Sequence, residues 1–170
     1  MRLVLALCLA LLPGPAPAGP PDLVPQDARA DLIRVDKSGR RMDLLRKGMV
    51  IATYPIRLGE DGDDGHKMRQ GDERTPEGRY TVDWRNPGSR FHLSLHISYP
   101  NAADRARAAA AGEDPGGDIM IHGFPNGWGL LAWPLHLMGD WTDGCIAVSD
   151  AQMREIWSLV PDGTPIEIRA

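Results

Sequence analysis

The sequence is poor in positive charge and in long apolar segments, and each shortage excludes a class of protein. Its 19 lysines and arginines are outnumbered by 23 aspartates and glutamates, the formal net charge is −4, and no basic run occurs. A mildly acidic chain without a basic run is a poor nucleic-acid binder, so we expect no nucleic-acid partner. The apolar run at residues 3–12 is about half as long as a membrane span, and no later segment could cross a membrane.

The N-terminal apolar run has the form of a secretory signal peptide. It follows Arg2 and precedes a segment of prolines and small residues that ends at Ala18. A basic residue, a short apolar run and a small-residue cleavage site are the three parts of such a signal. We therefore predict a signal peptide at residues 1–18, a flexible linker at 19–30 and one domain at 31–170. The mature protein is expected in a periplasm or cell-wall space, without stable membrane insertion.

Cysteine is also scarce, and removal of the predicted signal leaves one. The sequence contains only Cys8 and Cys145, and Cys8 lies within the signal. A single cysteine cannot form an internal disulfide, and a free thiol in an exported protein is a candidate nucleophile. The alternative is a buried, inert cysteine. Because a thiol with an ordinary pKa of about 8.5 is only a few per cent ionised at pH 7, a nucleophilic Cys145 needs a base, and His122 is the candidate.

Short apolar segments separated by glycine-bearing turns predict a mainly β, mostly antiparallel fold. The pattern indicates strands at residues 32–35, 42–45, 49–56, 80–84, 91–99, 118–121, 145–148 and 165–169. Asn101 and Ser149 are typical N-cap residues, and each predicts a helix that begins after it. A strand that ends at His122 and another that begins at Cys145 suggest acyl transfer through a thioester. The order of the two residues argues against a papain-like protease.

Three other segments were considered as functional sites. Residues 60–65 do not fit a calcium loop, because a glycine stands where a ligand is needed. In the strand predicted at 91–99, His92 and His96 share a face but lie about 13 Å apart, too far to bind one metal ion, although His96 could line a cleft. The connection at 124–140, with tryptophans and a possible helical turn at 130–137, is either a substrate lid or a flap packed on the core.

Four motifs in order along the chain resemble those of one enzyme family. They are Lys67 to Gly71, Thr75-Pro76-Glu77-Gly78, Ile121-His122-Gly123 and Thr142 to Ile146. Together they resemble the L,D-transpeptidase catalytic domain (YkuD-type) over residues 32–168. The resemblance implies a mixed, mostly antiparallel, β-sandwich-like domain with one or two short packed helices. It also implies that the enzyme acts on peptidoglycan stem peptides: it cleaves the bond from an L-centre to D-Ala, forms a cysteine thioester, and passes the acyl group to an amine or to water.

The resemblance assigns roles to individual residues. Cys145 would be the nucleophile and His122 the general base, with the Gly123 carbonyl orienting the imidazole. The backbone amides of Gly144 and Cys145 are candidates for the oxyanion hole. The candidate substrate-binding residues are Thr142, Asp143 and His96. No metal site and no cofactor are expected, and we expect a monomer.

The sequence departs from the family's pattern at two positions beside the nucleophile. Asp143 stands where the family commonly has histidine, and an aspartate there could steer an amine acceptor or hold protonated His122. Ala147 stands where many relatives have arginine, so a cationic contact to a substrate carboxylate is absent there. Three functions therefore remain: an L,D-transpeptidase, a hydrolytic relative (an L,D-carboxypeptidase or a cross-link amidase), and a non-catalytic peptidoglycan-binding module.

Overall fold

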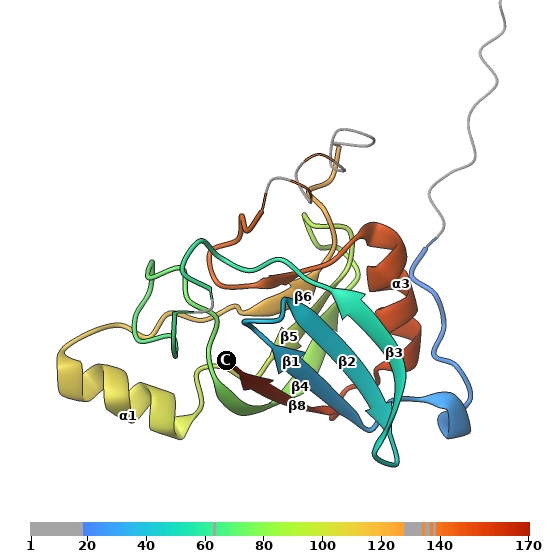
Figure 1. Cartoon of the computed structure of the whole chain (residues 1–170), viewed down its shortest axis with the longest axis horizontal. Helices are drawn as coiled ribbons and strands as arrows, with labels where there is room; N and C mark the ends of the chain where they lie inside the picture. Colours follow the sequence, from blue (N-terminus) through green and yellow to red (C-terminus); the bar gives the residue numbers. More distant parts are fainter. Residues whose placement is uncertain (1–18, 63, 128–133, 135–136, 138) are drawn as a thin grey trace, which may run out of the picture.

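The computed structural model describes residues 19–62, 64–127, 134, 137 and 139–170, and their strands form one mixed sheet (Figure 1). Along the sheet the order is β3-β2-β1-β8-β4-β5-β6-β7. The strands are β1 (Leu32–Asp36), β2 (Arg41–Arg46), β3 (Met49–Pro55), β4 (Gly78–Asn86), β5 (Ser94–Ile97), β6 (Met120–His122), β7 (Ile146–Ala147) and β8 (Pro165–Arg169). Neighbours are antiparallel except for the pairs β1–β8 and β6–β7. The predicted fold class, mainly β and mostly antiparallel, is confirmed.

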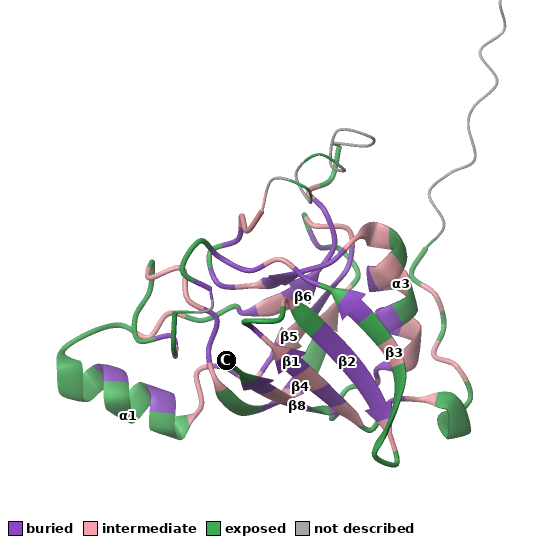
Figure 2. Ribbon diagram, in the orientation of Figure 1, coloured by how far each residue is buried: buried purple, intermediate pink, exposed green. Residues whose placement is uncertain are grey.

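Helix α3 (Asp150–Leu159) packs on the sheet and supplies part of the core. Its start is fixed by a capping box, in which Ser149 and Gln152 satisfy each other's backbone amides. Met153, Ile156 and Trp157 then repeat at helical spacing and are buried. Burying each large apolar side chain contributes about 1.5–3 kcal/mol, so this face holds the helix on the sheet. Figure 2 shows buried residues gathered on the central strands and on part of α3.

Helix α1 (Ala102–Ala111) is capped as the sequence indicates but packs little. The Asn101 side chain accepts hydrogen bonds from two amides of the first turn, and the Asp104 carboxylate accepts one from the Asn101 amide. Asp104 and Ala108 are its buried residues, and the rest is exposed (Figure 2). The alanine-rich sequence therefore forms a helix through capping and propensity more than through burial.

The strand predicted at 91–99 is wrong at both ends, because β5 spans only Ser94–Ile97. His92 has φ of 66°, in the left-handed region, and its amide donates to the Asn126 side chain instead of a neighbouring strand. A residue in that conformation interrupts the regular alternation of a strand. His92 and His96 therefore do not share one strand face.

The segment predicted as a linker, residues 19–30, lies along the domain. It contains the short 3-10 helix η1 (Gln26–Ala28). The amides of Val24 and Ala30 donate to carbonyls at the C-terminal end of α3, at 3.0 and 2.9 Å. The signal peptide predicted at residues 1–18 and most of the predicted helical turn at 130–137 lie outside the described residues. Within the described residues, every helix is too short or too polar to span a membrane.

Candidate active site

Two parallel strands bring His122 and Cys145 to the same place. In the pair β6–β7, Ile121 lies opposite Ile146 and His122 lies opposite Ala147. Cys145 directly precedes β7, so this register sets it beside Met120, and the Met120 amide donates to Cys145 Sγ at 3.4 Å. In this register His122 and Cys145 are offset by two residues along neighbouring strands, so their side chains lie on the same face of the sheet, at its β7 edge.

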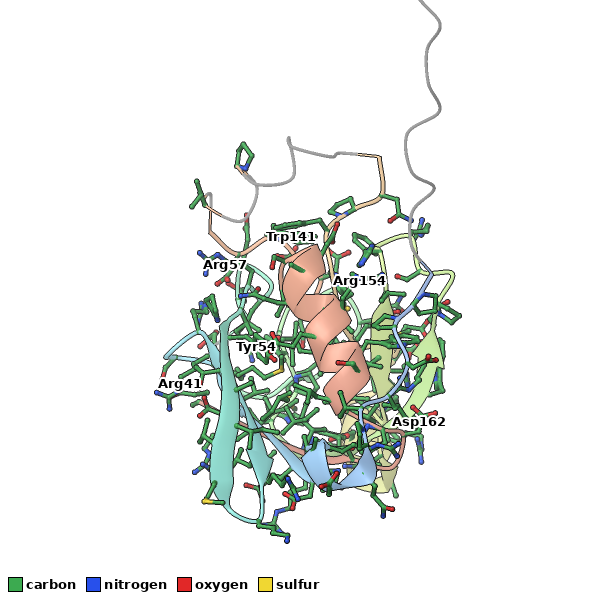
Figure 3. All side chains as sticks on the ribbon, turned by 90° about the vertical axis from the view of Figure 1, so that its right-hand side faces the viewer. Arg41, Tyr54, Arg57, Trp141, Arg154 and Asp162 are labelled. Carbon is green, nitrogen blue, oxygen red and sulfur yellow. The ribbon has the colours of Figure 1, made fainter. Side chains whose placement is uncertain are left out.

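His122 and Cys145 line a common cavity of about 790 Å³. Its wall is formed by Asn86, Gly88, Ser89, Arg90, Phe91, Ser94, Gly117, Asp118, Ile119, Met120, His122, Pro125, Trp141, Thr142, Asp143 and Cys145. Trp141 lies near the N-terminal end of α3 (Figure 3). A cavity of this size holds a ligand as large as a short peptide.

The His122 imidazole packs against two aromatic rings that also contact each other, at 6.2 Å between their centroids. Its centroid lies 4.6 Å from that of Phe91 and 5.6 Å from that of Trp141, and the side chain is buried. Its Nδ1 lies 2.7 Å from the Gly123 carbonyl oxygen. Because a carbonyl can only accept, this contact assigns the proton of the neutral ring to Nδ1 and leaves the lone pair on Nε2. Burial lowers the pKa of His122 to about 4, against the opposing effect of the Gly123 hydrogen bond, so the ring is a neutral base at pH 7.

Position 123 requires glycine, because atoms of neighbouring residues occupy the space that a side chain would need. A Cβ atom at this position would lie 2.5 Å from Asp150 Oδ1 and 3.0 Å from the Cβ of His92. The same Asp150 oxygen accepts the Phe124 amide at 2.8 Å, which ties the segment after His122 to the first turn of α3. A side chain at 123 would displace this segment and the carbonyl that orients the imidazole.

Cys145 is a half-buried thiol in its protonated form. Its Sγ accepts from the Met120 amide and lies 3.6 Å from the Asp118 carbonyl oxygen, to which the S–H donates. Burial raises the pKa of Cys145 to about 11, and the charges of Asp143 and Asp118 act in the same direction. The Met120 hydrogen bond and the charge of Lys67 oppose the shift. At pH 7 the resting site therefore pairs a neutral thiol with a neutral imidazole.

This protonation state predicts how Cys145 reacts with iodoacetamide. Because only the thiolate attacks, the alkylation rate should rise about tenfold per pH unit from pH 7 to 10, and at pH 7 it should be at least about tenfold slower than that of free cysteine. The measurement is the pseudo-first-order rate of carbamidomethylation of the Cys145 peptide by mass spectrometry. Asp143→Asn is the matched variant and should react faster, because it removes a charge that raises the thiol pKa. A rate that is constant between pH 5 and 8 would show a thiolate–imidazolium pair instead.

Thr142 organises the loop before Cys145. Its Oγ1 accepts the Gly144 amide at 3.2 Å and donates to the Cys145 carbonyl at 2.8 Å. Gly144 has φ of 111°, which favours glycine. The Gly144 amide, one of the two predicted oxyanion donors, is thus already engaged by Thr142, and the Cys145 amide is the stronger candidate. Asp143 is exposed at the cavity wall.

The third predicted substrate-binding residue lies elsewhere. Within the described part of the chain, the lining of the cavity does not include His96. Its Nδ1 lies 2.5 Å from Asp83 Oδ1, and its ring stacks on Trp84 at 5.1 Å. Ala147 is fully buried, and its amide and carbonyl both bond to the backbone of Arg57.

Several residues at the site were not identified from the sequence. Phe91 and Trp141 pack against His122, and Asp118 and Met120 contact the Cys145 thiol through their backbones. Trp141 directly precedes the cysteine motif, which could have indicated it, whereas Phe91 is remote in sequence and gave no signal. Among the described residues, no group of three histidine, cysteine or acidic side chains is placed to hold a metal ion.

A histidine and a cysteine that face one cavity are the side chains that cysteine acyl-transfer enzymes use as base and nucleophile. The comparison with known families is consistent with this class. A model of the L,D-transpeptidase catalytic domain, YkuD, matches residues 30–168. The chain belongs to this family.

Individual relatives agree with the assignment. The Escherichia coli (strain K12) protein named "Putative L,D-transpeptidase YafK" is 38% identical over 98 residues, which cover 54% of this chain and 37% of that protein. Among solved structures, the helical cell shape determining protein Pgp2 of Campylobacter jejuni has a TM-score of 0.59 at 22% identity, over 84% of this chain and 48% of that one. Bd1075 of Bdellovibrio bacteriovorus has a TM-score of 0.56 at 24% identity, over 91% and 53%. The two structures show a shared fold. The chain spans about half the length of each of these two proteins and less than half the length of YafK.

Proposed function

We propose that this protein is an exported peptidoglycan L,D-transpeptidase. The observation that carries the proposal is the shared cavity of His122 and Cys145 within a domain of this family. The substrate would be a stem tetrapeptide, whose bond from an L-centre to D-Ala is cleaved. Export would follow from the signal peptide predicted at residues 1–18, and the mature protein would act as a monomer in the periplasm or cell-wall space.

The acyl transfer would begin from a neutral thiol and a neutral imidazole and proceed in steps. His122 Nε2 removes the thiol proton as Cys145 Sγ attacks the carbonyl carbon, and the Cys145 amide stabilises the oxyanion. Collapse of this intermediate breaks the bond to D-Ala, whose nitrogen takes the proton from His122, and a thioester remains. An amine of a second stem then attacks the thioester, with His122 again as base, and the free thiol returns. Because the pKa of His122 is low, the imidazolium formed in the first step is a strong acid toward the leaving amine.

A hydrolytic relative is the second candidate, and position 147 favours it. Ala147 is a fully buried methyl group in β7, so it offers no charge to a substrate carboxylate. Without that contact a substrate carboxylate of the donor stem is held less firmly, and hydrolysis of the thioester competes better with transfer to an amine. The products would then be a tripeptide stem and free D-Ala, as for a carboxypeptidase, or an opened cross-link.

Transpeptidation and hydrolysis are distinguished by incubating the protein with a disaccharide-tetrapeptide and identifying the products by mass spectrometry. We expect a cross-linked dimer with release of D-Ala. Tripeptide alone would contradict transpeptidation and support hydrolysis. Neither product, together with binding to purified sacculi, would support a non-catalytic binding module.

A further inference from the structure

Thr75, the first residue of the Thr75-Pro76-Glu77-Gly78 motif, lies behind the loop that carries the nucleophile. It is fully buried, and its Oγ1 donates a hydrogen bond of 3.0 Å to the carbonyl oxygen of Gly144. Gly144 directly precedes Cys145. The Thr75 hydroxyl therefore binds the peptide unit that joins the loop to the nucleophile.

The hydrogen bond from Thr75 determines which way the Cys145 amide points. The Gly144 carbonyl and the Cys145 N–H belong to one planar trans peptide unit, so oxygen and hydrogen point in opposite directions. Among the described residues, the cavity is lined by Thr142, Asp143 and Cys145 but not by Thr75. Because Thr75 holds the carbonyl on the side away from the cavity, the Cys145 N–H is directed toward it.

We propose that Thr75 is a positioning residue for the oxyanion hole: its hydroxyl fixes the Gly144–Cys145 peptide so that the Cys145 N–H faces the substrate carbonyl oxygen. The inference rests on the acyl-transfer function proposed above. It adds a residue that does not touch the substrate and acts through the backbone of the nucleophile.

Thr75 is itself held by a buried network. Its carbonyl accepts a hydrogen bond of 3.0 Å from Lys37 Nζ, and its amide donates to Gly62. Lys37 is fully buried, and its ammonium forms an ion pair with Glu77 at 2.8 Å. A buried cation with a carboxylate and carbonyl partners is fully compensated and keeps its geometry. The motif thus presents the hydroxyl from a fixed backbone.

The Gly144 peptide, in contrast, needs an external restraint. Its φ of 111° is readily accessible only to glycine, and Thr142 binds the Gly144 amide and the Cys145 carbonyl but not the Gly144 carbonyl. A Cβ atom at 144 would lie 2.6 Å from the Arg74 carbonyl oxygen, so the segment before Thr75 also presses against this residue. If the hydroxyl is lost, the buried Gly144 carbonyl loses the donor that Thr75 supplies, and an unsatisfied buried carbonyl favours rotation of the peptide toward another donor. An oxyanion donor must lie about 2.7–3.1 Å from the developing charge, so a small rotation weakens it.

The test compares Thr75→Val, which removes the hydroxyl, with Thr75→Ser, which keeps it. Two reactions of Cys145 are measured on the full-length protein: acylation by 4-nitrophenyl acetate, which forms an oxyanion, and alkylation by iodoacetamide, which does not. Mass spectrometry of the Cys145 peptide separates both from reaction at Cys8. In Thr75→Val the rate at which the ester acylates Cys145 should fall at least about tenfold, while the alkylation rate stays unchanged. In Thr75→Ser the acylation rate should equal that of the wild type.

A general loss of structure at the site would expose the thiol, so alkylation would rise toward the rate of free cysteine while acylation fell, and that result would overturn the inference. Unchanged acylation in Thr75→Val, or failure of serine to restore it, would also overturn it. If Thr75→Val does not fold, Thr75→Ala replaces it, because alanine and serine differ only by the hydroxyl. If the wild type reacts with the ester but not with a stem peptide, the proposed substrate is contradicted and the test of Thr75 stays valid. If the wild type reacts with neither the ester nor the stem peptide, the proposed function and the role of Thr75 are both overturned.

Discussion

Replacing Cys145 with serine is expected to lower the rate of thioester-dependent turnover of a stem tetrapeptide by at least ~10³-fold without unfolding the protein. A hydroxyl is a far weaker nucleophile than a thiol, and the neutral His122, with its pKa of about 4, is too weak a base to compensate. The fold should survive, because a serine hydroxyl can replace the thiol in its contacts with the Met120 amide and the Asp118 carbonyl. Release of D-Ala measures turnover, and thermal unfolding followed by circular dichroism measures stability.

Cys145→Ala is the companion variant for this experiment. It removes the nucleophile and both contacts of the side chain, so it separates chemistry from packing. If both variants lose activity and remain folded, Cys145 acts chemically. If both unfold, Cys145 is instead the buried, structural cysteine that the sequence leaves open.

Replacing His122 with glutamine should lower kcat/KM for the same substrate by roughly 10²–10⁴-fold, the usual contribution of a general base. The variant should still alkylate with iodoacetamide at the wild-type rate, because the resting thiol is not ionised by an imidazolium. Loss of acylation with unchanged alkylation is therefore the expected signature. A parallel loss of both would show that His122 maintains a thiolate in the resting protein, contrary to the lowered pKa of His122 and the raised pKa of Cys145.

His96→Gln is the matched control for the histidine experiment. His96 pairs with Asp83 and stacks on Trp84, away from the described cavity lining, so near wild-type activity is expected. A large rise in KM would instead support the substrate-binding role predicted from the sequence.

Local sequence patterns predicted most of the secondary structure, because helix caps and strand alternation act over a few residues. The N-caps Asn101 and Ser149 both begin helices, as the sequence indicates. The place of β8 in the sheet could not be predicted, since it inserts between β1 and β4 through pairings remote in sequence. The left-handed backbone at His92, which delays the start of β5, depends on a tertiary contact with Asn126.

The candidate site was predictable to the extent that it depends on residue type. A lone thiol and a histidine at a strand end indicated Cys145 and His122 directly. Alternation assigned His96 to a strand face but could not tell which face borders the cavity. Phe91 reaches His122 only through the folded sheet, and Thr75 acts on Gly144 across 69 residues, so neither contact leaves a local pattern.

The central claim, acyl transfer through Cys145, is tested most directly by the mass of the intact protein after brief mixing with disaccharide-tetrapeptide and acid quench. Acyl transfer through Cys145 predicts an adduct with the mass of the disaccharide-tetrapeptide minus D-Ala, which peptide mapping places on Cys145 and which the Cys145→Ala variant does not form. Release of D-Ala without any adduct on Cys145, or with an adduct on another residue, would contradict it.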